Sequence, residues 1–260
     1  MTTASRTATR LRLFLVAGKR LVRASVGLIY PPQCAFCNIA LAEETETPFC
    51  EDCRRRLVPA GLPQCQRCAS VVNAFEQRER DCASCRKERF HFDRALALAR
   101  YEGTMREAVL RMKTSSEEPL MMAMGHLLAE RFADEIQALG PDVVVPIPMH
   151  WTRRLVRGTN SAEVIGDVLS RQLRLLFAPR ALRRRQRTRK LAELTRQERK
   201  RTLRNAFCIA RGCDFAGARV LLVDDVLTTG TTCDTAARAL KDGGAAEIAV
   251  LVAARAQPPH

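Results

Sequence analysis

Four cysteine pairs restrict what the first third of this 260-residue chain can fold into. Each pair has the spacing C-x-x-C, and 12, 11 and 13 residues separate successive pairs. A C-x-x-C turn brings two thiolates to one side of a knuckle, and two knuckles complete a tetrahedral four-thiolate zinc site. The pattern therefore predicts two structural zinc ions. Their ligands would be Cys34, Cys37, Cys50, Cys53, Cys65, Cys68, Cys82 and Cys85.

Disulfide bonds and redox motifs are the other uses of such pairs. A redox site uses one C-x-x-C near a βαβ pattern, not four in a charged segment. Disulfides belong mainly to exported proteins. The apolar run at 13–18 has only six residues before Lys19 and Arg20 interrupt it, which is too short for a signal peptide. We therefore expect a cytoplasmic protein, and no apolar run is long enough to predict a transmembrane segment.

The cysteine-containing segment is too short to bury much apolar surface, so we expect metal to supply much of its folding energy. Sequential pairing, which joins 34/37 with 50/53 and 65/68 with 82/85, is the most economical arrangement. The spacing leaves other pairings open. A segment with these properties looks like a double zinc ribbon.

Positive charge is concentrated in two segments, which together account for the net charge of +15. Residues 1–30 contain six basic and no acidic residues, and residues 180–204 contain twelve basic and two acidic residues. Either segment could contact a polyanion or a phosphorylated ligand, or could be a solvated helix face. Residues 1–30 further predict a basic amphipathic helix, which either packs onto the zinc module or lies on a membrane surface.

After Cys85 the apolar pattern alternates between strands and helices. Strand patterns occur at 94–101, 142–148, 206–210, 218–226 and 246–256. Helical spacing occurs at 104–113, 117–139, 159–173, 195–204 and 230–242. This alternation predicts an α/β fold: an open, mainly parallel sheet with helices on both faces.

Residues 220–232, VLLVDDVLTTGTT, predict a strand followed by a phosphate-binding loop. The strand delivers Asp224 and Asp225 at its carboxyl end, where ligands bind in open α/β sheets. Gly230 permits a tight turn, and the helix N-terminus that follows favours an anion. Hydroxyls that can bind phosphate oxygens belong to Thr228, Thr229, Thr231 and Thr232. The alternative is an acidic helix cap beside a solvated loop, but this combination of residues favours a ribose 5-phosphate site.

This segment resembles the phosphoribosyl pyrophosphate (PRPP) signature of type I phosphoribosyltransferases. Together with the four knuckles, it makes the chain resemble the ComF family over about residues 28–256. That family pairs a double zinc ribbon with a type I phosphoribosyltransferase-like domain. The run VPIPMHWTRRLVRGTNS at 145–161 matches the family pattern at His150, Arg153, Arg157, Gly158 and Asn160. It departs from the pattern at Trp151, Thr159 and Ser161.

The resemblance implies roles for further residues. Arg153 and Arg157 would face the pyrophosphate, and guanidinium groups do fork onto phosphate oxygens. Lys113, in a stretch that also resembles the family, is a further phosphate-binding candidate. Residues 183–207 correspond to a mobile basic loop and the helix after it. This segment departs from the family pattern at Leu191 and Thr202.

The resemblance also implies a function and a domain organisation. The chain would bind PRPP or ribose 5-phosphate with Mg²⁺, and Asp224 and Asp225 would take part in transfer to a nitrogen acceptor. The family is associated with DNA uptake in competence, which leaves two alternatives: a non-enzymatic protein that handles single-stranded DNA with competence proteins, and a PRPP sensor. The expected parts are a basic helix at 1–30, a double zinc ribbon at 31–90 and a phosphoribosyltransferase-like domain at 91–260.

Overall fold

The computed structural model describes residues 32–42, 47–59, 63–73, 82–87, 89–149, 158–184 and 206–257. The helices expected at 1–30 and 195–204 lie outside these ranges. The chain divides into two compact units, residues 1–53 and residues 54–260. In the described parts of the chain, no helix combines the length and the apolar character that crossing a membrane requires.

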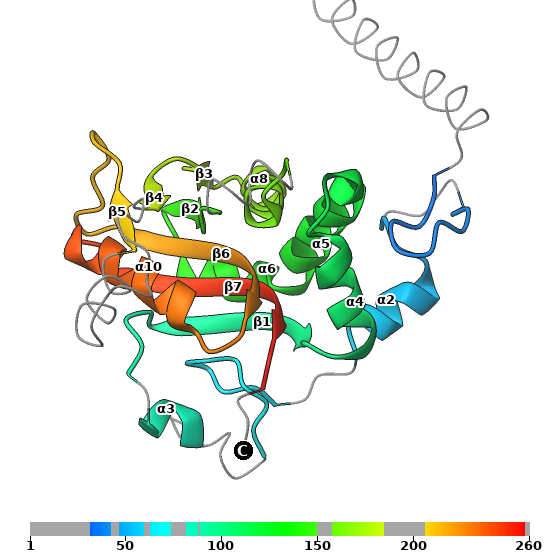
Figure 1. The fold of residues 1–260 in the computed structure, drawn as a ribbon, viewed down its shortest axis with the longest axis horizontal. Coiled ribbons are helices and arrows are strands. Elements are labelled where there is room, and N and C mark those ends of the chain that lie inside the picture. Colours follow the sequence, from blue (N-terminus) through cyan, green and yellow to red (C-terminus); the bar gives the residue numbers. More distant parts are fainter. Residues whose placement is uncertain are drawn as a thin grey trace, which may run out of the picture. The chain divides into compact units, whose positions relative to one another are not determined.

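A five-stranded sheet forms the core of the second unit (Figure 1). Its strand order is β1-β7-β6-β2-β3, and every neighbouring pair is parallel. The strands are β1 (Arg94–Arg100), β2 (Val143–Pro146), β3 (Leu176–Phe177), β6 (Arg219–Leu227) and β7 (Glu247–Arg255). The middle strands β6 and β7 are largely buried, as parallel strands covered on both faces should be.

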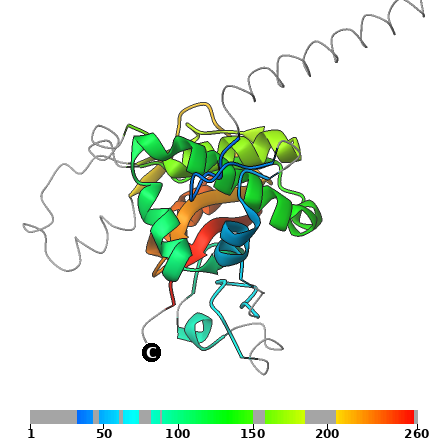
Figure 2. The same ribbon diagram turned by 90° about the vertical axis from the view of Figure 1, so that its right-hand side faces the viewer.

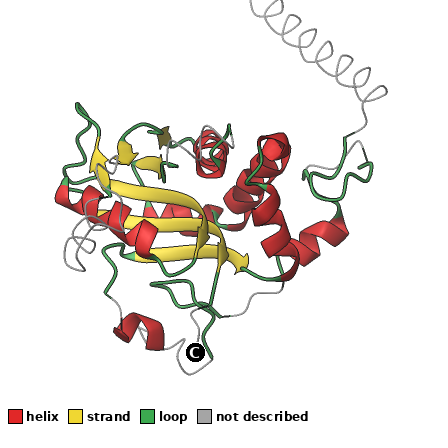
Figure 3. Ribbon diagram, in the orientation of Figure 1, coloured by secondary structure: helices red, strands yellow, loops and turns green. Residues whose placement is uncertain are grey.

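Helices cover both faces of this sheet (Figures 2 and 3). The helices α4 (Gly103–Arg111), α5 (Glu118–Arg131) and α6 (Ala133–Leu139) connect β1 to β2, with a short 3-10 turn, η2 (Ser115–Glu117), before α5. Helix α8 (Ser161–Leu173) connects β2 to β3, and α10 (Thr231–Asp242) connects β6 back to β7. Right-handed crossovers that run in opposite directions place α10 on one face and α8 on the other. The predicted fold class is therefore confirmed.

Two of the expected elements differ in the structure. The single helix predicted at 117–139 is wrong, because the backbone leaves the helical region at Phe132 (φ −116°, ψ 18°) while the Phe132 side chain stays buried. The strand predicted at 206–210 is not part of the main sheet. It is β5 (Phe207–Ile209), which pairs antiparallel with β4 (Leu182–Arg184). Only the first residue of each of these two strands is buried, which is typical of a ribbon with one covered face.

The strands β2 and β6 lie side by side, but the chain leaves them in opposite directions. In open α/β sheets, such a switch point leaves a crevice beyond the carboxyl ends of the two strands. The β2–β6 ladder ends at Pro146, opposite Val223, whereas β6 continues to Leu227. The end of β6 therefore extends past its neighbour, and this extension carries the predicted acidic pair.

Candidate functional site

The eight paired cysteines form two clusters of four. One contains Cys34, Cys37, Cys50 and Cys53, and the other contains Cys65, Cys68, Cys82 and Cys85. This is the sequential grouping that the spacing favoured. Three sulfur–sulfur distances are 3.7 Å for Cys37–Cys50, 3.9 Å for Cys65–Cys85 and 3.6 Å for Cys68–Cys82. They match the edge, about 3.8 Å, of a tetrahedron with zinc–sulfur bonds of about 2.3 Å. Both donor sets therefore fit a structural zinc ion.

The two clusters are built on one repeated turn. Segments 32–41 and 63–72 read PQCAFCNIAL and PQCQRCASVV. In each, the amide of the first cysteine donates to the carbonyl five residues later, at 2.8 Å. The residue four positions after that cysteine, Asn38 or Ala69, has a left-handed backbone (φ 60° and 56°). A short helix follows the third cysteine of each cluster: α2 (Glu51–Leu57) or α3 (Ala83–Lys87). The shared Pro-Gln-Cys signals this repeat.

Crowding of the thiols separates their pKa values. Burial acts to raise the pKa of Cys34, but backbone hydrogen bonds from Cys37 and Cys50 outweigh it and lower this pKa to about 6. Side-chain hydrogen bonds from Cys68 and Cys85 lower the pKa of Cys65, while the hydrogen bond with Cys65 raises the pKa of Cys85. Each cluster thus contains a thiol that ionises readily, and the thiolate is the form that binds metal.

The acidic pair lies at the end of β6 that extends beyond β2. Successive side chains of a strand point to opposite faces, so Asp224 and Asp225 do not point the same way. Asp225 faces α8, where the Ser161 hydroxyl donates to its Oδ2 at 3.3 Å. Asp224 faces α10, where its Oδ2 is 3.9 Å from the Cys233 sulfur. The Asp225 amide also donates to Asp224 Oδ1 at 2.9 Å, which fixes the Asp224 carboxylate against the strand.

The two carboxylates have different electrostatic surroundings. Burial and the negative charge of Asp225 raise the pKa of Asp224 well above its ordinary value of 3.8. Burial and the nearby aspartates also raise the pKa of Cys233 well above its ordinary value. The Cys233 thiol is therefore neutral and packs in the core at 1% exposure. Any cation or hydroxyl-bearing ligand beside Asp224 would relieve the charge that the fold disfavours there.

The threonine loop, residues 228–232, follows the end of β6 directly in the chain. Thr228, Thr229, Thr231 and Thr232 are all exposed, whereas Gly230 is buried. Gly230 has φ 83° and is the residue before α10, so the turn depends on a left-handed conformation that glycine adopts at little cost. The Thr231 amide donates to Thr229 Oγ1 at 3.4 Å, and the two hydroxyl oxygens are 2.9 Å apart. The result is a helix N-terminus with a cluster of exposed hydroxyls, which suits a phosphate group.

The remaining predicted ligand-binding residues are only partly placed. Arg153 and Arg157 lie outside the described residues, as do His150, Leu191 and Thr202. Lys113 is half-buried in the turn after α4. Two residues on, the Ser115 Cβ is 3.4 Å from where a Cβ would stand at Gly158, so this turn lies against the end of the loop that follows β2.

Two residues that hold the site were not assigned this role from the sequence. Ser161, noted only as a departure from the family pattern, bonds Asp225. Arg255 ends β7 and donates to the carbonyl oxygens of Leu227 and Thr228. The signal for Arg255 was present: it is the one basic residue in the run AEIAVLVAARA, and it follows seven consecutive apolar residues. At 3% exposure it is the only buried arginine in the described ranges.

Comparison with known proteins finds the two kinds of domain that the family resemblance implied. A double zinc ribbon domain matches residues 25–89, and a phosphoribosyl transferase domain matches residues 159–260. "Competence protein F" of Haemophilus influenzae is 28% identical over 86% of this chain and 97% of its own length. "DNA utilization protein YhgH" of Escherichia coli strain K12 is 28% identical over 86% and 96%.

Among solved structures, the glutamine PRPP amidotransferase of B. subtilis is similar at 23% identity. The similar region covers 51% of this chain and 25% of that protein, with a TM-score of 0.37. A score of this size supports no conclusion about function.

We predict two zinc ions per chain in the purified protein, measured by metal analysis. Cys50→Ser and Cys82→Ser should each lower the content to one, because each removes one ligand from a different four-thiolate site. Cys213→Ser alters an exposed cysteine outside both clusters and should leave two. A Cys82→Ser protein that keeps two zinc ions would contradict the second site.

Asp224→Asn should raise the free energy of unfolding at neutral pH, because asparagine has no charge to bury. Since the folded-state pKa of Asp224 is raised, the folded protein binds more protons than the unfolded chain above pH 3.8, and stability falls as pH rises through that window. The gain from the substitution should vanish below pH 3.8 and widen above it, as urea unfolding across a pH series would measure.

The matched control for this series is Asp242→Asn, which alters a side chain that is 72% exposed. It should change stability little at any pH. A stability difference between Asp224→Asn and wild type that stays constant from acid to neutral pH would show that Asp224 is not the titrating group.

Proposed function

We propose that this chain, which belongs to the ComF family, binds PRPP with Mg²⁺ in the crevice beyond the carboxyl ends of β2 and β6. The observation that carries the proposal is the extension of β6. It brings two carboxylates past the end of β2 and leads, within five residues, to a glycine turn and a helix N-terminus with four exposed threonines. Each part recognises a different part of a phosphorylated ribose.

The 5′-phosphate would bind at the threonine loop. Helix N-termini have unpaired amides and a partial positive charge, which favour an anion. The exposed hydroxyls of Thr228, Thr229, Thr231 and Thr232 add donors to its oxygens. Gly230 keeps the backbone of this turn close to the ligand, because no side chain intervenes.

The ribose would bind beside the acidic pair. Ser161 holds the Asp225 carboxylate on the side of α8, where it would accept hydrogen bonds from the ribose hydroxyls. Asp224 is half-buried beside the negative charge of Asp225, so a hydroxyl donor or a cation at the pair would stabilise its charged form. The carboxylate oxygens of Asp224 and Asp225 fit a hard cation such as Mg²⁺, which would offset the negative charge of the ligand there. Arg153 and Arg157 would supply further positive charge to the pyrophosphate.

Bound PRPP has one reaction that suits a phosphoribosyltransferase domain. A nitrogen nucleophile forms a bond to the anomeric carbon, and the carbon–oxygen bond to pyrophosphate breaks. The transition state resembles an oxocarbenium ion, so this chain would contribute positioning and charge stabilisation. The basic segment at 180–204 would exclude water from the site. If no acceptor reacts, the same site would serve a PRPP sensor.

Single-stranded DNA is the second candidate ligand. Relatives named for competence and for DNA utilisation favour it, and the two basic segments supply charge for a phosphate backbone. The two functions are compatible, because PRPP would use the crevice and DNA a basic surface. Both clusters need reduced cysteines, which agrees with a cytoplasmic location.

Calorimetric titration with PRPP and Mg²⁺ tests the main proposal. Wild type should release or absorb heat that saturates at one ligand per chain. In Asp224→Asn/Asp225→Asn, affinity should fall at least about 100-fold, because each lost charged hydrogen bond is worth about 1.5–3 kcal/mol. Asp242→Asn should bind like wild type. Absence of binding by wild type, or full affinity in the double variant, would refute the PRPP site.

Single-stranded DNA binding across a salt series tests the second candidate. If the basic segments bind phosphates, affinity should fall steeply and linearly with the logarithm of salt concentration. Replacing Arg199, Lys200 and Arg201 together with glutamine should reduce the slope by about 2, at about 0.7 per lost contact with a single strand. Salt-independent affinity would remove the electrostatic basis of this candidate.

A further inference from the structure

Arg255, at the end of β7, links the phosphate loop to the second cysteine cluster. Its side chain is buried at 3% exposure. The Nε atom donates to the carbonyl oxygen of Cys68 at 2.9 Å. On the other side of the guanidinium, Nη1 donates to the carbonyls of Leu227 at 2.9 Å and of Thr228. The planar, rigid fork of arginine therefore holds a metal-binding knuckle and the threonine loop at a fixed separation.

These two hydrogen bonds, together with one from the Ala256 amide to the Leu227 carbonyl at 3.0 Å, fix where the loop amides point. In a planar trans peptide, the carbonyl of one residue and the amide of the next point in opposite directions. With the carbonyls of Leu227 and Thr228 bound to Arg255, the amides of Thr228 and Thr229 must point away from it. Both threonines are exposed, so a ligand can reach this side of the loop. Arg255 thus prepares the loop for an anion without contacting it.

Phe90 supplies a second link between the same two parts. Its ring packs against the group of buried residues around Cys65, Cys68, Cys82 and Cys85, and also against the core beneath α10. A Cβ placed on Gly230 would lie 2.8 Å from Phe90 Cε1, so the turn of the phosphate loop rests directly on this ring. Phe90 in turn stacks on Phe92 at a centroid distance of 4.7 Å.

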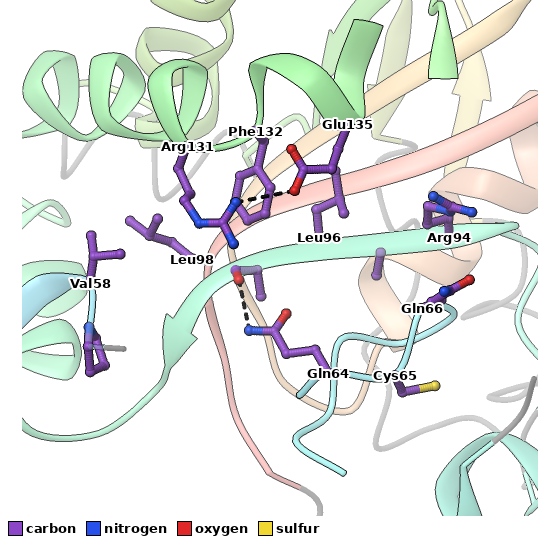
Figure 4. Close-up of a pocket in the computed structure, with 13 residues that line it drawn as sticks. Val58, Gln64, Cys65, Gln66, Arg94, Leu96, Leu98, Arg131, Phe132 and Glu135 are labelled. Carbon is purple, nitrogen blue, oxygen red and sulfur yellow. Dashed lines mark hydrogen bonds and ion pairs between the residues drawn. The ribbon is translucent and has the colours of Figure 1, made fainter. Parts of the chain in front are cut away.

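The second knuckle is also bound along β1 at the edge of the sheet. The Ala95 amide donates to the carbonyl of Gln66 at 3.3 Å, and the Gln64 side chain donates to the carbonyl of Ala97 at 3.1 Å (Figure 4). A cavity of about 420 Å³ lies along the same edge. Ala69 of this knuckle belongs to the core beneath α10. The knuckle therefore cannot move independently of the sheet that carries the loop.

We propose that Arg255 is a positioning residue through which the cluster of Cys65, Cys68, Cys82 and Cys85 holds the phosphate loop in its binding geometry. Loss of metal from this cluster releases the Cys68 carbonyl, loosens Arg255 and disorders the loop amides. The ligand part of this inference rests on the proposed PRPP site. The coupling of cluster to loop does not, so the two can be tested separately.

Hydrogen exchange of the amides at 228–232, measured without ligand, tests the coupling. Arg255→Lys keeps the charge, but a single ammonium cannot reach both Cys68 and the loop carbonyls. Exchange at 228–232 should accelerate at least about tenfold, whereas amides in the middle of β6 should be unaffected. Arg219→Lys is the matched control, because Arg219 lies at the opposite end of β6 in a partly exposed ion pair with Glu247. It should leave loop exchange unchanged.

A double-mutant comparison separates coupling from two independent structural defects. Cys82→Ser alone should also accelerate loop exchange, and combining it with Arg255→Lys should give less than the product of the two effects, because both break the same connection. If the two residues acted independently, their effects on the loop exchange rate would multiply. If Cys82→Ser does not fold, the comparison of Arg255→Lys with Arg219→Lys decides the coupling alone.

Affinity for PRPP and Mg²⁺, measured on the same proteins, distinguishes the two proposals. Arg255→Lys should bind about tenfold more weakly than wild type and Arg219→Lys. Unchanged exchange and unchanged affinity in Arg255→Lys would overturn the inference. Accelerated loop exchange in Arg255→Lys, with no PRPP binding by wild type, would uphold the coupling and refute the proposed ligand.

Discussion

The candidate ligand site depends on the point at which strands β2 and β6 cease to pair. The β2–β6 pairing ends with Pro146 opposite Val223, after one last hydrogen bond from the Ile147 amide to the Val223 carbonyl. β6 remains paired with β7 as far as Leu227. One side of the Asp224–Asp225 segment is therefore held rigidly while the other side has no strand beside it. A carboxylate pair on a rigid strand end, beside a crevice, is positioned before any ligand arrives.

The two cysteine clusters share a backbone design but differ in their surroundings. The cluster of Cys34, Cys37, Cys50 and Cys53 lies in the first compact unit, and its Cys37 is exposed. In the other cluster all four cysteines are buried, and the knuckle covers the edge strand β1. An open strand edge invites pairing with other chains, so covering it protects the sheet. A duplicated turn has thus been used once within a small unit and once as part of a larger core.

Much of this arrangement follows from the sequence, because the signals are local. C-x-x-C spacing, the apolar strand before Asp224 and the glycine among threonines each need only neighbouring residues to be read. The break at Phe132 and the separate β4–β5 ribbon were missed, because a periodic apolar pattern does not show where a helix turns or which strand a short segment pairs with. The contacts of Arg255 join residues 187 and 28 positions apart, and no local pattern encodes such a pairing.

The way Arg255 and Phe90 connect the ribbon to the loop bears on how this protein can be divided. Truncation at residue 91 would remove the Cys68 carbonyl, the Ala69 side chain and the Phe90 ring. A buried guanidinium would lose an acceptor, and Gly230 would lose the surface on which it rests. The smallest fragment that retains the phosphate loop intact begins before Pro63, with the second knuckle included. Exchange or loss of this half of the ribbon would therefore require the loop to be rebuilt.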